Sequence, residues 1–399
     1  MTLAASADRP HWGQVAIAAL AQNFASGLCF GSFGTMILAI EREYAASRSQ
    51  SSMALSLAVV SLCVTAMLVG RIIHRVDLRN LLIAGALTSA AGFGAASVAT
   101  GPVQLLLSYL LLIGPGTAML GVLPAMTLAT RWVPETLRGR ALGIVNMPLL
   151  VMIVPLVTAP VLTVYGVRTA FQALALADLA LVPLLLGTRN GTSSAGATQA
   201  ASVPARAILS QPAFWVLSLA VGLITGAGTM KLAHFIPLLV GQGRSFGEAN
   251  SLLALSGGSG LLGSMAFGYL ADRIGGPRAL AVNAAVQAVV WTIFLFPVSL
   301  PILTVDAILV GACGGGVQGA FGVAVAARFG PTAFGRAFSL FQLSTLPFLF
   351  AMTPIASMLF ERTGSYYLPM GLTVGLLAFC AVILQLLGRH PANPENHIA

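Results

Sequence analysis

Four ionisable side chains lie well inside long apolar stretches of the chain: Asp178, Lys231, His234 and Asp306. An aspartate or lysine at the centre of a membrane-spanning helix costs about 2.5–3.5 kcal/mol on insertion scales, so such groups generally face a water-filled cavity or one another. A buried lysine can bind an anion as a compact point charge, and histidine or aspartate can exchange a proton. The sequence contains no Ser/His/Asp, metal-ligand or paired-carboxylate arrangement that would indicate an enzyme.

The spacing of three of these residues predicts a common site. Lys231 and His234 are three residues apart and are expected to share a helix face. At 1.5 Å per residue, Lys231 lies about 28 Å from the helix start at Pro212, and Asp306 about 33 Å from Arg328. If both helices line one cavity, Lys231 and His234 bind substrate in its outer half, while Asp306 and His234 serve proton coupling or an outer gate. A structural Lys231–Asp306 ion pair that only closes the gate is the alternative.

Two neutral residues complete the predicted substrate site. Asn23 is a candidate because three glycines continue its helical face and would leave open space beside it: Gly27, Gly31 and Gly34. Gln318 is a second candidate, although it lies about 120° around the helix from Asp306, so that one ligand would not easily touch both. Further glycines are dense on two stretches, 114–121 and 311–322, where small residues predict close helix packing.

The composition indicates that lipid surrounds most of the chain. It is 57% hydrophobic and only 8% charged, against about 25% charged in soluble domains. Apolar runs long enough to cross a bilayer are expected at 13–40, 50–70, 80–100, 103–130, 141–165, 169–188, 212–240, 248–270, 278–298, 301–327, 335–360 and 366–388.

The net charge of +9 is an orientation signal and does not indicate nucleic-acid binding. With the N-terminus inside, 14 arginines fall in cytoplasmic segments and five in outer loops, as expected for a protein with both termini in the cytoplasm. The four cysteines all lie in apolar runs without metal-ligand spacing. No cofactor or metal is expected.

Polar loops repeat at half the chain length. Residues 268–273 read G-Y-L-A-D-R and residues 70–75 read G-R-I-I-H-R, 198 positions earlier. Such a period predicts two homologous membrane-embedded halves, at 1–187 and 212–399, joined by a cytoplasmic linker at 188–211. These loops, together with the R-G-R and F-G-R turns, are interpreted as cytoplasmic gates that contain Gly70, Arg75, Gly268, Asp272, Arg273, Arg140 and Arg336.

The two gates are predicted to be unequal. His74 stands where the second half has Asp272, so an acid-dependent latch is expected to be stronger in the second half. The alternative is that the loops are stop-transfer and turn signals, with Gly275, Gly276 and Pro277 making the turn.

The loop motifs resemble those of the major facilitator superfamily over residues 12–390. The Y-G-V-R-T-A-F segment at 165–171, the F-I-P-L-L segment at 235–239 and the stretch 247–275 resemble its monocarboxylate and oxalate/formate porter branch. The resemblance implies a bundle of six plus six helices, with helices 1, 4, 7 and 10 around a central cavity that opens alternately to each side. That branch typically carries an Arg and an acid in helix 8, where this chain has Ser264 and Gly260.

The resemblance also bears on Asp178, because helix 6 tends to be a peripheral support helix in that fold. Asp178 is therefore interpreted as a protonated, hydrogen-bonded packing acid, with a proton relay as the alternative.

Together these observations predict an all-α membrane protein with 12 transmembrane helices in two pseudo-symmetric halves. The expected function is secondary transport of a small organic anion, a monocarboxylate by preference, by proton symport or anion exchange. Efflux of a hydrophobic or cationic compound and a transport-dead sensor or scaffold are the alternatives. The expected partners are the substrate, protons and the bilayer, and the protein is expected to be a monomer in the cell inner membrane.

Overall fold

The computed structural model describes residues 11–73, 75–134, 137–189 and 204–389, and within them it contains helices and no strand. The predicted all-α class is confirmed. Contacts divide the chain into two compact units, 1–196 and 197–399. The linker predicted at 188–211 falls largely outside the described residues.

The helices of the first unit make six apolar passes. The first pass has a π-helical segment, η1, between two α-helices, and the fourth contains a second such segment, η2. The elements are α1 (Trp12–Ser26), η1 (Gly27–Gly31), α2 (Ser32–Glu43), α3 (Arg48–Ile72), α4 (Leu78–Val98), α5 (Pro102–Ser108), η2 (Tyr109–Ile113), α6 (Gly114–Leu120), α7 (Val122–Arg131), α8 (Arg138–Val145) and α9 (Leu149–Leu185).

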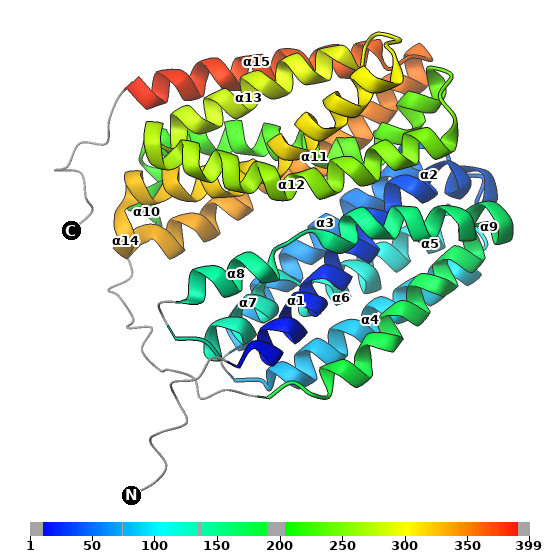
Figure 1. Cartoon of the computed structure of the whole chain (residues 1–399), viewed down its shortest axis with the longest axis horizontal. Coiled ribbons are helices and arrows are strands. Elements are labelled where there is room, and N and C mark those ends of the chain that lie inside the picture. Colours follow the sequence, from blue (N-terminus) through cyan, green and yellow to red (C-terminus); the bar gives the residue numbers. More distant parts are fainter. Residues whose placement is uncertain (1–10, 74, 135–136, 190–203, 390–399) are drawn as a thin grey trace, which may run out of the picture. The chain divides into compact units, whose positions relative to one another are not determined.

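The second unit repeats the arrangement with longer helices. Figure 1 shows α13 and α15 side by side in this unit, in line with their extensive contacts. Its elements are α10 (Ala205–Leu209), α11 (Pro212–Gly241), α12 (Phe246–Ile274), α13 (Gly276–Ile293), α14 (Leu300–Thr363) and α15 (Tyr367–Arg389).

Glycines divide the two longest helices. Gly166 in α9 has a φ of +83°, and Gly330 in α14 has a φ of +71°, a backbone region that glycine enters without steric penalty. Ten stretches of the described residues are long and apolar enough to span a membrane, and one of them, 140–185, holds the two passes on either side of Gly166. With α13 at the predicted ninth position, the helices correspond to the twelve expected runs.

The half-chain repeat extends to the ends of the helices that are expected to face outward. In the first unit, Tyr44 Oη donates to the Ala96 carbonyl at 2.7 Å. In the second, Gln242 Nε2 donates to the Phe294 carbonyl at 2.5 Å. Both partners are displaced by 198 positions, so each unit ties the end of its first pass to the end of its third in the same way.

The same offset recurs in the helix caps that follow. Ser47 and Gln50 form a capping box at the start of α3, and Ser245 and Glu248 form one at the start of α12. In such a box the serine side chain accepts from a backbone N–H that the helix leaves unpaired. The glutamine or glutamate side chain accepts in turn from the backbone N–H of the serine. The two halves therefore share turn chemistry as well as apolar length.

Close packing is confirmed at several of the glycines predicted to provide it. A Cβ on Gly114 would lie 1.9 Å from Ser61 Oγ, and one on Gly311 would lie 1.9 Å from the Ser256 carbonyl oxygen. At Gly314, by contrast, no described heavy atom lies within 4 Å of such a Cβ. Close packing therefore explains the glycine at 311 on one face of α14, but it does not explain the glycine at 314.

Candidate functional site

Lys231 is a buried cation whose hydrogen-bond partner is a neutral hydroxyl group. It lies on α11, is 9% exposed, and its Nζ donates to Ser256 Oγ of α12 at 3.2 Å. The Ser256 hydroxyl in turn donates to the Leu253 carbonyl at 2.8 Å. Within the described residues no carboxylate lies at ion-pair distance from Lys231. The ammonium group of Lys231 is thus able to bind an anion.

Asp306 is buried without a counter-charge. It lies near the start of α14, is 1% exposed, and neither carboxylate oxygen has a hydrogen-bond partner in the described chain. Gly311, five residues further on, packs against Ser256, which places Asp306 about 7.5 Å along α14 from the level of the Lys231 contact. The ion pair considered for Lys231 and Asp306 is not formed in this structure.

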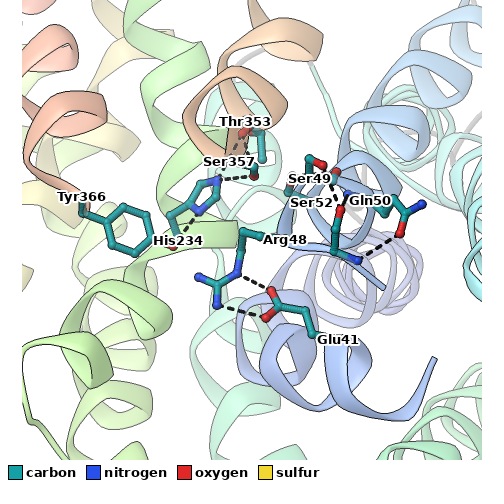
Figure 2. Close-up of polar contacts among 10 residues, drawn as sticks. Glu41, Arg48, Ser49, Gln50, Ser52, His234, Thr353, Ser357 and Tyr366 are labelled. Atoms are coloured by element: carbon teal, nitrogen blue, oxygen red, sulfur yellow. Dashed lines mark hydrogen bonds and ion pairs between the residues drawn. The ribbon is translucent and has the colours of Figure 1, made fainter. Parts of the chain in front are cut away.

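His234 lies in a hydrogen-bonded network of its own (Figure 2). The ring is fully buried, with Nδ1 3.1 Å from Tyr366 Oη and Nε2 3.1 Å from the Thr353 carbonyl oxygen. Ser357 Oγ lies 3.2 Å from the same Nε2. A carbonyl only accepts, so Nε2 carries a hydrogen and donates to Thr353.

The structure does not bring His234 together with Lys231. Lys231 contacts α12, whereas His234 contacts the part of α14 after Gly330 and the turn before α15. Three residues on a helix differ in direction by about 60°, which is enough to aim the two side chains at different neighbours. His234 ties three passes of the second unit together.

The open space predicted beside Asn23 is not there. A Cβ on Gly27 would lie 2.5 Å from Leu150 Cβ, and one on Gly31 would lie 3.2 Å from Val151 Cα. The Asn23 amide is also engaged, since Nδ2 donates to the Ala19 carbonyl at 3.0 Å and Oδ1 accepts from the Leu150 N–H at 3.1 Å. Asn23 caps the start of α9, and its glycine face is filled by that helix. Gln318 is exposed on α14.

The predicted gating residues lie near helix ends, except Arg336, which lies within α14 six residues after Gly330. Gly70 and Gly268 lie in the last turns of α3 and α12, and the side chains of the other predicted gating residues are exposed: Arg75, Arg140, Asp272, Arg273 and Arg336. Arg273 stacks over the Tyr269 ring with Cζ 4.5 Å from the centroid. Asp272 forms no ion pair with a described residue of its unit, and His74 lies outside the described residues. The latch therefore remains a prediction.

Sequence analysis missed two ion pairs of the first unit. Arg48 Nη2 donates to Glu41 at 2.9 Å (Figure 2), and Arg168 Nε lies 2.6 Å from Glu43 Oε1. Arg168 also donates to the Ser97 carbonyl at 3.0 Å. The sequence does place these four charged residues at the borders of the apolar runs. Which of them pair depends on how the helix ends meet, which the sequence does not reveal.

Two six-pass units with buried, unpartnered charges are the architecture of a membrane transporter. The chain belongs to the Major Facilitator Superfamily, whose family model matches residues 19–290. The predicted fold is confirmed, and membership identifies a multi-pass membrane transporter and not an enzyme.

Solved structures of transporters share the fold. A bacterial homologue of the human lysosomal transporter Spinster, solved in an inward-facing and unoccupied conformation, is 16% identical with a TM-score of 0.73, over 94% of this chain and 97% of that one. A D-xylose–proton symporter is 14% identical with a TM-score of 0.75, over 98% of this chain and all of that one. No curated protein sequence matches the chain.

Proposed function

We propose that this transporter carries a small organic anion, with a monocarboxylate as the best fit, by proton symport or anion exchange. The observation that supports this proposal is the buried Lys231 ammonium group. Its hydrogen-bond partner is the neutral Ser256 hydroxyl and not a carboxylate that would neutralise its charge. A carboxylate that reached Lys231 would form a charge-assisted hydrogen bond, roughly twice as strong as a neutral one. The distribution of arginines supports an inner-membrane protein with both termini in the cytoplasm.

A site with Lys231 as its one cation among the described residues favours a monoanion. A dicarboxylate would bring a second charge, and burying a charge without a partner is strongly unfavourable. Ser256 can rotate to donate to the bound carboxylate, since its hydroxyl now donates to a backbone carbonyl of its own helix. His234 and Asn23 are already hydrogen-bonded, so we assign them to helix packing instead of substrate contact.

Asp306 is the proposed proton-coupling residue. Its carboxyl group is buried and has no hydrogen-bond partner among the described residues, so its negative form is stable only when water or a cation reaches it. Support comes from a structurally similar protein, which is a D-xylose–proton symporter. In this proposal Asp306 takes up and releases the proton and Lys231 binds the substrate anion, at neighbouring levels of the second unit.

The test is uptake by purified protein in proteoliposomes, with formate, acetate and lactate as probes. We expect Lys231→Ala to weaken the apparent affinity at least about 10-fold, because a hydrogen bond to a charged group contributes roughly 1.5–3 kcal/mol. Lys231→Arg keeps the charge and should retain part of the uptake. Arg362→Ala removes an exposed arginine as a control. Unchanged carboxylate affinity in Lys231→Ala would overturn the proposal.

A second candidate function is efflux of a hydrophobic cation, which the unpartnered Asp306 carboxylate favours. Asp306→Asn distinguishes the two. Under proton symport, it abolishes uptake driven by a pH gradient but leaves carboxylate counterflow intact. Under cation efflux, it abolishes binding of tetraphenylphosphonium, and Lys231→Ala does not. A sensor or scaffold would show no flux of any of these probes.

A further inference from the structure

Asp178 is a buried acid in the first unit that the proposed transport site does not use. It lies on α9 after the Gly166 break, is 1% exposed, and both carboxylate oxygens lack a hydrogen-bond partner within the described chain. Its interaction with the Ser89 hydroxyl of α4 does not meet hydrogen-bond geometry. The interpretation of Asp178 as a hydrogen-bonded packing acid therefore stays a prediction, with the Ser89 hydroxyl as its candidate partner.

The groups around Asp178 are a thiol and hydroxyls. The Cys29 thiol interacts electrostatically with the Asp178 carboxylate, and the Thr117 hydroxyl lies beside that thiol. Tyr109 interacts with Cys29, and its hydroxyl is buried with no described partner. Among the described residues, the titratable groups linked electrostatically to this acid are thus Cys29 and, through Cys29, Tyr109.

Charged groups of the same unit lie at its ends. Arg168, on α9 itself, is ten residues from Asp178, or about 15 Å along the helix, and is paired with Glu43. On α4 the basic residue is Arg79, which is exposed and ten residues from Ser89, again about 15 Å. Neither arginine can serve as a direct counter-charge at Asp178.

The first unit contains two π-helical segments, and one of them packs against the helix that carries Asp178. Cys29 belongs to η1 (Gly27–Gly31), which packs against α9, and Tyr109 belongs to η2 (Tyr109–Ile113), which packs against α3 and α4. Single-turn π segments are rare and occur frequently at functional sites. They are also positions at which helices bend and exchange hydrogen bonds. Asp178 therefore lies on a helix that packs directly against one of these segments, η1.

An ionised carboxylate in this setting would be unsolvated and unpaired, a state that proteins avoid by neutralising the group. We propose that Asp178 is a proton-binding site of the first unit, which holds its proton in the conformation described here and releases it when rearrangement of η1 or η2 admits water. The proton moves between the Asp178 carboxyl oxygen and that water. This site is separate from Lys231 and does not depend on the anion assigned there.

The donor set favours a proton over a metal cation. Hard cations require several oxygen ligands, whereas the carboxylate here is accompanied by a thiol, and the Thr117 hydroxyl already donates to the Ile113 carbonyl at 2.7 Å. No group of three or more His, Cys, Asp or Glu residues in the described chain could hold a metal ion.

Infrared spectroscopy of the full-length protein in lipid tests the titration directly. A protonated aspartate shows a carboxylic-acid C=O band that disappears on ionisation. We expect a band that is lost in Asp178→Asn and that decreases in the native protein as pH is raised. A band that is absent, or one that does not change with pH, would overturn the proposal, because a purely structural acid stays protonated.

The native Cys29 provides a second readout of water entry. In a variant that keeps Cys29 as its single cysteine, alkylation by a small maleimide should depend on pH differently from the same variant carrying Asp178→Asn, because an ionised Asp178 admits water to the thiol and also repels the thiolate. A variant that keeps Cys380 alone, equally buried in the second unit, controls for the intrinsic pH dependence of thiols and should respond identically in both backgrounds. Equal Cys29 profiles in the two backgrounds would contradict the proposal, and the Lys231 experiments would be unaffected.

Discussion

Gly27 shows how a single missing side chain sets the distance between two helices. The sequence pattern suggested a hollow next to Asn23, but the glycine is there so that η1 can approach α9, where a Cβ would lie 2.5 Å from Leu150 Cβ and 2.9 Å from the Leu150 carbonyl carbon. Small residues in lipid serve either to leave space or to let backbones meet. The sequence alone does not distinguish these two roles.

We therefore predict that Gly27→Ala destabilises the protein by about 1–3 kcal/mol, the usual penalty of overpacking. The matched control is Gly94→Ala on α4, where no described atom lies within 4 Å of the new Cβ. That change should be neutral or slightly stabilising, because alanine is the better helix former. Unfolding by a denaturing detergent, followed by circular dichroism, measures both. Equal stability of the two variants would refute the contact.

A glycine with positive φ lies between the last two passes of each unit, within α9 in the first unit and at the end of α14 in the second. Gly166 (φ 83°, ψ 174°) and Gly364 (φ 68°, ψ 9°) occupy equivalent places, 198 positions apart, between the last two passes of each unit. The first conformation is essentially restricted to glycine, whereas the second is the left-handed region that other residues enter at a modest cost.

We expect Gly166→Ala to destabilise the protein more than Gly364→Ala, by up to about 3 kcal/mol against roughly 1–2 kcal/mol. Gly371→Ala, in the regular part of α15 with no described atom near its Cβ, provides the control. Thermal unfolding of the three variants in one detergent gives the ranking. A reversed order for the two turn glycines would show that the neighbouring helices, and not the local backbone, determine the cost.

The positions of the passes follow from the sequence because about 20 apolar residues are needed to cross hydrocarbon. The direction of each side chain does not. Lys231 and His234 differ by about 60° on α11, and which neighbour each meets depends on where α12 and α14 pack. Likewise, η1 and η2 have no signature in apolar length, so the surroundings of Asp178 could not be foreseen.

At the scale of the whole molecule, the repeat provides two independent copies of one tether. Tyr44 and Gln242 each tie a first pass to a third pass, and each bond lies within one unit. We predict that Tyr44→Phe and Gln242→Leu each destabilise the protein by about 1 kcal/mol, as expected for a lost hydrogen bond. In the double variant the effects should add, because the sites share no partner. A free energy far from the sum would show that the two sites are energetically coupled.

The offset of 198 residues that relates the first passes of the two units pairs each position in one pass with a position in the other. The position equivalent to Lys231 is Phe33, a fully buried ring that packs edge-on against Tyr109 at 5.8 Å between centroids. Where the second unit offers a cation, the first offers an aromatic pair. The anion site that we propose at Lys231 therefore has no repeat-related copy in the first unit. If that proposal holds, a dicarboxylate with identical ends should bind no more tightly than the matching monocarboxylate.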